Sequence, residues 1–90
     1  MTRPAPAWRV PPAGGPAPDR IRVNSVRPGL IDTPMIAANT PEVNAGIVAA
    51  TPLKRAGSTG QVARLVLFLA SDEASYITGA EVAIDGGWTA

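Results

Sequence analysis

The residues of this chain that could perform chemistry are few. Its 90 residues include no Cys and no His. A thiolate nucleophile, a Ser-His-Asp triad and a zinc site built on cysteine or histidine are therefore excluded, and we expect no metal site. What remains is ligand binding by backbone groups and hydroxyls. The segment that favours such binding is the turn at Pro28 and Gly29.

This turn has two interpretations. Proline fixes the backbone and glycine lets a ligand approach it closely, while unpaired amides past the carboxyl end of a strand can face that ligand. Alternatively, Pro28 and Gly29 merely end a strand, and Thr33 caps the segment that follows. The residues alone leave both interpretations open.

A strand must lead into the turn. β-Branched residues alternate with polar ones and predict that strand at about 21–27. The connection that follows, residues 30–57, is rich in proline and glycine. It leaves room for one short helix over Pro41–Ala50, with Thr40 as the N-cap and proline at the first helical position.

The strongest local signal comes next. Ser58 and Gln61 form a capping box, and apolar residues then recur at helical spacing. This pattern predicts an amphipathic helix over about 59–70, and a second short strand is expected at about 81–85. A helix between two strands implies a parallel pair, the βαβ unit of α/β proteins.

The expected fold class is α/β, as one part of a larger sheet. Two parallel strands with one good helix cover a single face, whereas parallel strands normally have both faces covered. For a chain of this size, apolar burial less ordering entropy comes to nearly zero. We therefore expect residues 19–90 to form a partial domain that is incomplete on its own. Residues 1–18, which hold six of the ten prolines, are expected to be a disordered tail.

The composition argues against two further classes of partner. Eight basic and seven acidic side chains give a net charge of +1 and no basic stripe of the kind that nucleic-acid binding needs. The longest apolar run, residues 65–70, is far too short to span a bilayer, and no signal-peptide pattern is present. We expect no nucleic-acid partner, no membrane partner and a cytoplasmic location.

Several ordered motifs resemble one family, the short-chain dehydrogenases/reductases. The run from Ile21 to Met35 resembles the segment that leaves the sixth strand of that family's nucleotide-binding sheet. The later motifs resemble the approach to its last long helix, the end of that helix, and the final strand with its exit: Pro52–Gly57, Leu67–Asp72, and Tyr76–Gly79 with Asp85–Trp88. The resemblance covers roughly residues 17–90 and is therefore specific. The residues of these motifs are similar to those of hydroxysteroid dehydrogenase-like members of the family.

The resemblance implies the C-terminal part of a doubly wound, Rossmann-like parallel sheet. It also implies hydride transfer between NAD or NADP and a small alcohol or carbonyl substrate. In the family, the backbone around the turn and the residue matching Ile31 bind the nicotinamide carboxamide, and the hydroxyl matching Thr33 adds a contact. The cofactor-binding residues implied here are Pro28, Gly29, Leu30, Ile31 and Thr33.

Residues 30–57 match the family's variable substrate lid. Met35, Ile36 and Ile47 are therefore expected to line an apolar substrate pocket. The alternative is that these side chains only make core contacts beneath a loop.

The sequence departs from the family where the family's chemistry resides. The catalytic acid there is a tyrosine with a lysine four residues later, whereas Tyr76, the only tyrosine, is followed at that spacing by Ala80. The catalytic serine and asparagine and the glycine-rich phosphate loop have no counterpart either. We therefore expect no catalytic residue in this chain, no activity of the chain alone, and weak or absent cofactor binding. The simplest account is a fragment of a longer dehydrogenase.

A second hypothesis is a non-catalytic interaction fragment. The helix at 59–70 and the strand at 81–85 match surfaces that the family commonly uses to form dimers and tetramers. These elements could dock on another copy of the chain or on a full-length member of the family.

Overall fold

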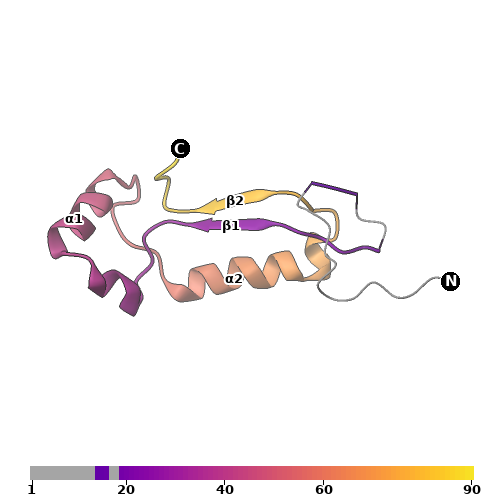
Figure 1. The fold of residues 1–90 in the computed structure, drawn as a ribbon, viewed down its shortest axis with the longest axis horizontal. Coiled ribbons are helices and arrows are strands. Elements are labelled where there is room, and N and C mark those ends of the chain that lie inside the picture. The colour runs from indigo at the N-terminus through magenta and orange to yellow at the C-terminus, as the bar shows by residue number, and fades with distance from the viewer. Residues whose placement is uncertain (1–13, 17–18) are drawn as a thin grey trace.

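The fold was obtained as a computed structural model, which describes residues 14–16 and 19–90 (Figure 1). Two short strands lie side by side, and one helix runs along them. In chain order the elements are β1 (Ser25–Pro28), the 3-10 helix η1 (Pro34–Ala38), α1 (Pro41–Ala50), α2 (Thr59–Ala70), the 3-10 helix η2 (Asp72–Ala74) and β2 (Glu81–Ile84). The tail predicted over 1–18 lies outside the described residues, apart from residues 14–16.

β1 and β2 form a parallel pair, as the sequence predicted. The register runs from Ser25 opposite Glu81 to Pro28 opposite Ile84. The second strand, expected at about 81–85, therefore ends one residue earlier.

The prediction that the first strand begins at about residue 21 is wrong, because the pairing there is mixed: the Gly79 N–H donates to the Val23 carbonyl at 2.7 Å, but side chains take the other partners. The Thr78 hydroxyl accepts the backbone N–H of Val23 at 3.1 Å. The Asn24 amide donates to the Ile77 carbonyl at 3.1 Å and accepts the Ala80 N–H at 3.0 Å. These residues run beside each other without the regular ladder, which starts with β1.

Both longer helices begin where their capping residues predicted. The Thr40 hydroxyl accepts the Val43 N–H at 3.2 Å and caps α1. Ser58 and Gln61 cap α2, because the side chain of each accepts the backbone N–H of the other, at 3.2 and 2.9 Å. Neither these nor the other helices of the described residues are long and apolar enough to cross a membrane.

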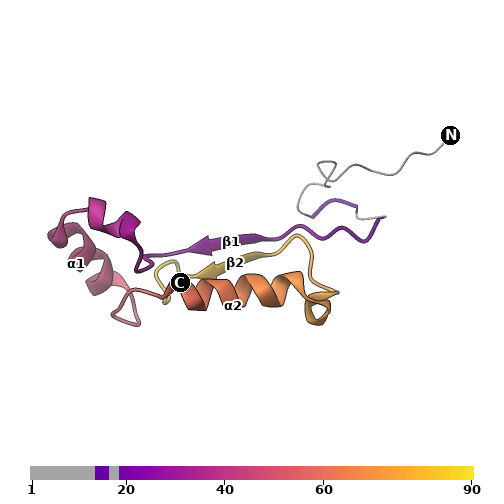
Figure 2. The ribbon, with the colours of Figure 1, turned by 90° about the horizontal axis from the view of Figure 1, so that it is seen from below.

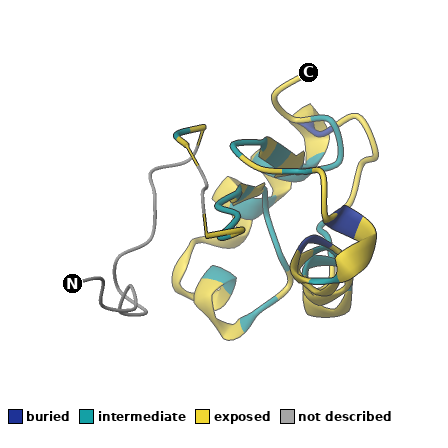
Figure 3. Ribbon diagram, turned by 90° about the vertical axis from the view of Figure 1, so that its right-hand side faces the viewer, coloured by how far each residue is buried: buried dark blue, intermediate teal, exposed yellow. Residues whose placement is uncertain are grey.

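The core is small and lies on one side of the sheet. α2 runs along one face, and no helix of the described residues covers the other face (Figure 2). Within the described ranges only Leu69, Ala74 and Thr51 are buried (Figure 3). Val66, on the same apolar stripe as Leu69, is 48% exposed. Burial is thus as limited as expected for one part of a larger sheet.

The connection over residues 30–57 contains η1 and α1. Both lie beyond the carboxyl ends of the two strands, to the left of the arrowheads in Figure 1. In open α/β sheets, ligands bind outside the carboxyl ends of the strands. The residues that follow β1 are therefore positioned to contact a ligand.

Candidate functional site

The site begins where the chain leaves β1. Gly29 donates its backbone N–H to the Ile84 carbonyl at 3.0 Å. A Cβ atom at Gly29 would lie 2.8 Å from Asp85 Cβ and 2.9 Å from Asp85 Cα. Side chains do not approach so closely, so only glycine fits between Pro28 and the residues that follow.

Past Gly29 the chain pairs briefly with the residue that precedes α2's cap. The Gly57 N–H donates to the Leu30 carbonyl at 2.9 Å, and the Asp32 N–H donates to the Gly57 carbonyl at 2.8 Å. In this parallel arrangement the N–H and C=O of Ile31 point away from Gly57. They make no hydrogen bond to any other described group. Ile31 therefore presents a free donor and a free acceptor beside each other.

Thr33 also keeps a polar group free. It occupies the N-cap position of η1, and its carbonyl accepts the Ile36 N–H at 3.1 Å. Its side chain makes no capping hydrogen bond. Thr33 thus caps the next segment by position and through its carbonyl, but its hydroxyl makes no capping bond and is available to a ligand.

A hollow of about 660 Å³ brings these groups together. Its lining includes all five residues implied for cofactor binding and two of the three expected in the lid: Pro28, Gly29, Leu30, Ile31 and Thr33, with Met35 and Ile36. None of its lining residues carries a charged side chain. The hollow thus offers an apolar wall with a few polar groups at one edge, which is typical of small-molecule sites.

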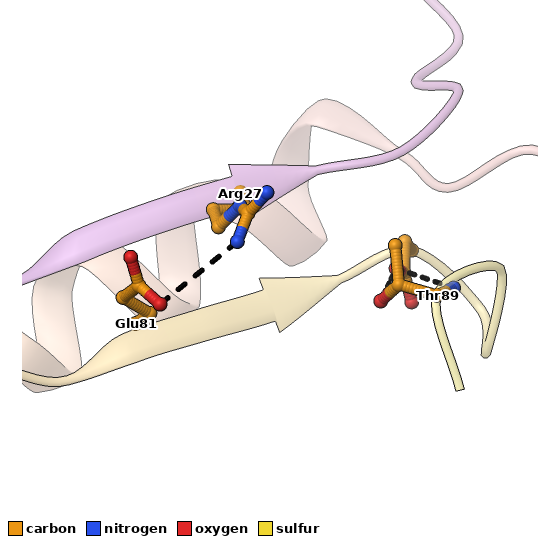
Figure 4. Close-up of polar contacts among 4 residues, drawn as sticks. Arg27, Glu81 and Thr89 are labelled. Atoms are coloured by element: carbon orange, nitrogen blue, oxygen red, sulfur yellow. Dashed lines mark hydrogen bonds and ion pairs between the residues drawn. The ribbon is translucent and has the colours of Figure 1, made fainter.

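The third expected lid residue, Ile47, lies elsewhere. It lines a second hollow of about 510 Å³, together with the strand residues Arg27, Glu81 and Ala83. Figure 4 shows Arg27 and Glu81 in front of the strands, with α2 behind them. The sequence grouped Ile47 with Met35 because both belong to one connection, but Ile47 lines only the second hollow, which shares Pro28, Gly29 and Leu30 with the first.

An ion pair and a group of hydrogen bonds to one carboxylate border this second hollow (Figure 4). The ion pair between Arg27 and Glu81 spans 3.9 Å between exposed side chains and contributes little to stability. The Asp85 carboxylate accepts hydrogen bonds from the Thr89 hydroxyl at 2.7 Å, the Thr89 N–H at 3.1 Å and the Gly87 N–H at 3.0 Å. The hydrogen bond from the Thr89 hydroxyl is the largest cause and lowers the pKa of Asp85; desolvation, the second largest, raises it, and hydrogen bonds from backbone N–H groups lower it further, so that the net direction is down. Asp85 is therefore ionised at neutral pH and holds the C-terminal turn.

The sequence missed four residues of the first hollow. They come from the end of η1 and the first turns of α2: Asn39, Thr59, Val62 and Ala63. The capping box predicted where α2 starts, but it did not indicate which distant residues lie beside that start. The contact arises only because the bridge between Ile31 and Gly57 draws the start of α2 to the end of β1.

The sequence and the fold of this chain are both similar to those of known proteins. The family model described as Enoyl-(Acyl carrier protein) reductase matches residues 13–89. Cyclopentanol dehydrogenase from Comamonas testosteroni is 47% identical over 76 residues, which cover 82% of this chain and 30% of that protein. A 3-oxoacyl-acyl-carrier-protein reductase from Brucella melitensis has a TM-score of 0.75 at 47% identity, over 81% of this chain and 28% of that one. A short-chain type dehydrogenase/reductase from Mycobacterium ulcerans has a TM-score of 0.71 at 44% identity, over 77% of this chain and 26% of that one.

The chain belongs to the short-chain dehydrogenase/reductase family. This confirms the predicted family and the predicted fold, a part of a doubly wound, Rossmann-like sheet. The chain spans between 24% and 30% of the length of the curated short-chain dehydrogenases/reductases and related proteins that it matches. The hydroxysteroid dehydrogenase-like subgroup stays a prediction.

The single tyrosine lies far from the position that this family's chemistry requires. Tyr76 is fully exposed and precedes the amino end of β2, whereas the first hollow lies at the carboxyl end of β1. Ala80 follows it where a short-chain dehydrogenase/reductase would need a lysine. The described residues also contain no group of three or more acidic side chains that could hold a metal ion.

Proposed function

We propose that this chain supplies the nicotinamide-side wall of an NAD- or NADP-dependent oxidoreductase that interconverts an alcohol and a carbonyl compound. The observation that carries the proposal is the free N–H and C=O of Ile31 beside the free hydroxyl of Thr33, at the edge of an apolar hollow. A carboxamide carries one acceptor oxygen and a donor NH₂ group, so it is complementary to a free donor and a free acceptor on one residue.

Each residue of the wall has a part in this proposal. Gly29 lets the backbone turn against Asp85, and Ile31 binds the carboxamide of the cofactor through its backbone. The Thr33 hydroxyl adds a hydrogen bond, while Met35 and Ile36 provide apolar surface on the lid side. The bound nicotinamide supplies the carbon that accepts or gives the hydride.

The same proposal explains why the chain alone is expected to be inactive. These 90 residues contain neither a tyrosine followed four residues later by a lysine nor a glycine-rich loop to bind the pyrophosphate. The adenine half of the dinucleotide therefore gains nothing from this wall. We expect binding of the nicotinamide half alone, with a Kd on the order of 1 mM or weaker.

Replacing Thr33 with valine tests the polar edge of the wall. The variant is expected to weaken the binding of reduced nicotinamide mononucleotide roughly threefold to tenfold, because one hydrogen bond contributes about 0.5–1.5 kcal/mol. Thr33→Ser keeps the hydroxyl and is expected to retain the affinity. Affinities are measured by NMR titration of the full chain, and its stability should not change because the hydroxyl has no partner within the described residues. Equal affinity in the valine variant and the parent chain would count against this role.

The proposed substrate is a small alcohol or carbonyl compound, which is the class that a relative of this chain supports. Cyclopentanol dehydrogenase from Comamonas testosteroni acts, by its name, on a small alcohol. An uncharged alcohol or carbonyl substrate agrees with a lining that has no charged side chain. The choice between NAD and NADP and the cytoplasmic location stay predictions.

The alternative interaction function is favoured by one observation. α2 exposes three consecutive apolar side chains, with exposed fractions of 48% for Val66, 71% for Leu67 and 41% for Phe68. Together with β2, these exposed side chains of α2 would dock on a second copy of the chain or on a full-length short-chain dehydrogenase/reductase. Such docking is compatible with the nicotinamide-side wall, because the wall lies at the carboxyl end of β1.

A further inference from the structure

The lid helix α1 has little packing of its own. None of its residues is buried. The Asn44 amide donates to the Ile36 carbonyl at 2.9 Å, and Asn39 donates to Asn44 at 3.0 Å, so these bonds tie α1 to η1 within the same connection. The position of α1 relative to the sheet must therefore be set mainly by its carboxyl end.

That carboxyl end is packed against the C-terminal turn. Thr51, which caps α1, is only 4% exposed, although it lies in a connecting segment. A Cβ atom at Gly86 would lie 2.8 Å from Thr51 Cγ2, and one at Gly87 would lie 2.8 Å from Pro52 Cγ. The Leu53 N–H donates to the Gly86 carbonyl at 3.1 Å. Two glycines thus create the space that the end of the lid occupies.

The turn that carries these glycines is held by the Asp85 carboxylate together with two backbone hydrogen bonds, from the Trp88 N–H to the Asp85 carbonyl at 3.1 Å and from the Ala90 N–H to the Gly87 carbonyl at 3.0 Å. Gly86 and Gly87 have positive φ values of 62° and 94°, which are conformations that glycine adopts readily but does not hold by itself. Asp85 spans the turn, because one carboxylate oxygen accepts the Gly87 N–H and the other accepts both the N–H and the hydroxyl of Thr89. Hydrogen bonds to a charged acceptor are stronger than those between neutral groups.

We propose that Asp85 is a positioning residue for the lid: by fixing the turn Asp85–Thr89, it holds the carboxyl end of α1, which lines the second hollow, and through α1 it sets the position of η1, which lines the first. The functional meaning of this link rests on the nicotinamide-side wall proposed above. The mechanical link itself does not, because it involves only contacts between the C-terminal turn and residues 51–53.

Amide hydrogen exchange of the full chain, followed by NMR, tests the link without any cofactor. In Asp85→Asn one acceptor loses its charge and the turn loosens. We expect the amides of α1 and of Thr51 and Leu53 to exchange on the order of fivefold to twentyfold faster, while those of α2 change less than twofold. Glu81→Gln is the matched control, because it also converts a carboxylate near the C-terminus to an amide, and within the described residues this carboxylate forms an ion pair with the exposed Arg27 rather than bonds to the C-terminal turn. It should leave exchange in α1 unchanged.

Thr89 provides a second pair of variants. Thr89→Ala removes the hydroxyl that donates to Asp85 and is expected to speed exchange in α1, whereas Thr89→Ser keeps the hydroxyl and should restore the parent rate. Unchanged exchange in α1 for Asp85→Asn would overturn the proposal. An equal acceleration in α1 and α2 would also overturn it, since Asp85 would then act on the stability of the whole chain. Failure of nicotinamide mononucleotide to bind would leave this result intact, so the two proposals fail separately.

Discussion

Replacing Gly29 with alanine is expected to lower the free energy of unfolding by about 3 kcal/mol. The new methyl group would lie 2.8 Å from Asp85 Cβ and 2.9 Å from its Cα. One of these neighbours is backbone, so the strain cannot be relieved by rotating a flexible side chain. The ends of β1 and β2 would separate, and the hydrogen bond from Gly29 to Ile84 would be lost with them. Circular dichroism of the full chain measures the change as a lower folded fraction without urea and a lower urea midpoint, because so small a core leaves little stability to lose.

Gly46→Ala is the matched control for this substitution. Nothing lies within 4 Å of a Cβ atom placed at Gly46, which is inside α1. The substitution should therefore stabilise α1 by about 0.5–1 kcal/mol, because alanine favours helix more than glycine does. If both alanine variants unfolded at the same urea concentration, the close approach of Gly29 to Asp85 would not exist in solution.

Leu69→Ala is expected to have the second largest effect, a loss of about 2–3 kcal/mol. Leu69 is 8% exposed and is the largest buried side chain among the described residues. Its truncation removes the one buried side chain of α2 and leaves a cavity in a core that has few other buried residues among those described. Because the stability of so small a core is low, the folded fraction without urea is expected to fall as well.

Leu67→Ala is the control for Leu69→Ala, because it makes the same change of residue type in the same helix at an exposed position. Leu67 lies in the same helix but is 71% exposed, so its truncation should change the free energy of unfolding by less than about 0.5 kcal/mol. The comparison is made on the full chain under identical buffer conditions. A loss at Leu67 as large as that at Leu69 would mean that α2 does not pack on the sheet through Leu69.

Local signals allowed both helices to be predicted closely. Thr40 with proline after it and Ser58 with Gln61 satisfy backbone donors of their own helix ends, so no knowledge of distant residues was needed. The parallel pairing of the two strands followed from the helix between them. The limited burial followed from composition and length, because too few elements were present to cover both faces of a sheet.

Features that depend on distant residues could not be predicted. β1 starts late because Asn24 and Thr78 replace backbone partners across more than 50 residues of sequence. Ile47 was assigned to the lid pocket from its place in the chain, but it lines the second hollow together with residues of both strands and of the C-terminal turn. The free groups of Ile31 follow only from its bridge to Gly57. No local pattern in the sequence marks any of these contacts.

The central claim is that the end of β1 forms a wall for the nicotinamide half of a dinucleotide. The most direct measurement is an NMR titration of the full chain with reduced nicotinamide mononucleotide, and separately with adenosine monophosphate, mapped residue by residue. We predict that the nicotinamide compound shifts the amides of residues 29–33 and 35–36, and that adenosine monophosphate shifts none of them. Shifts of the same amides by adenosine monophosphate, or no shifts there with the nicotinamide compound, would contradict the account.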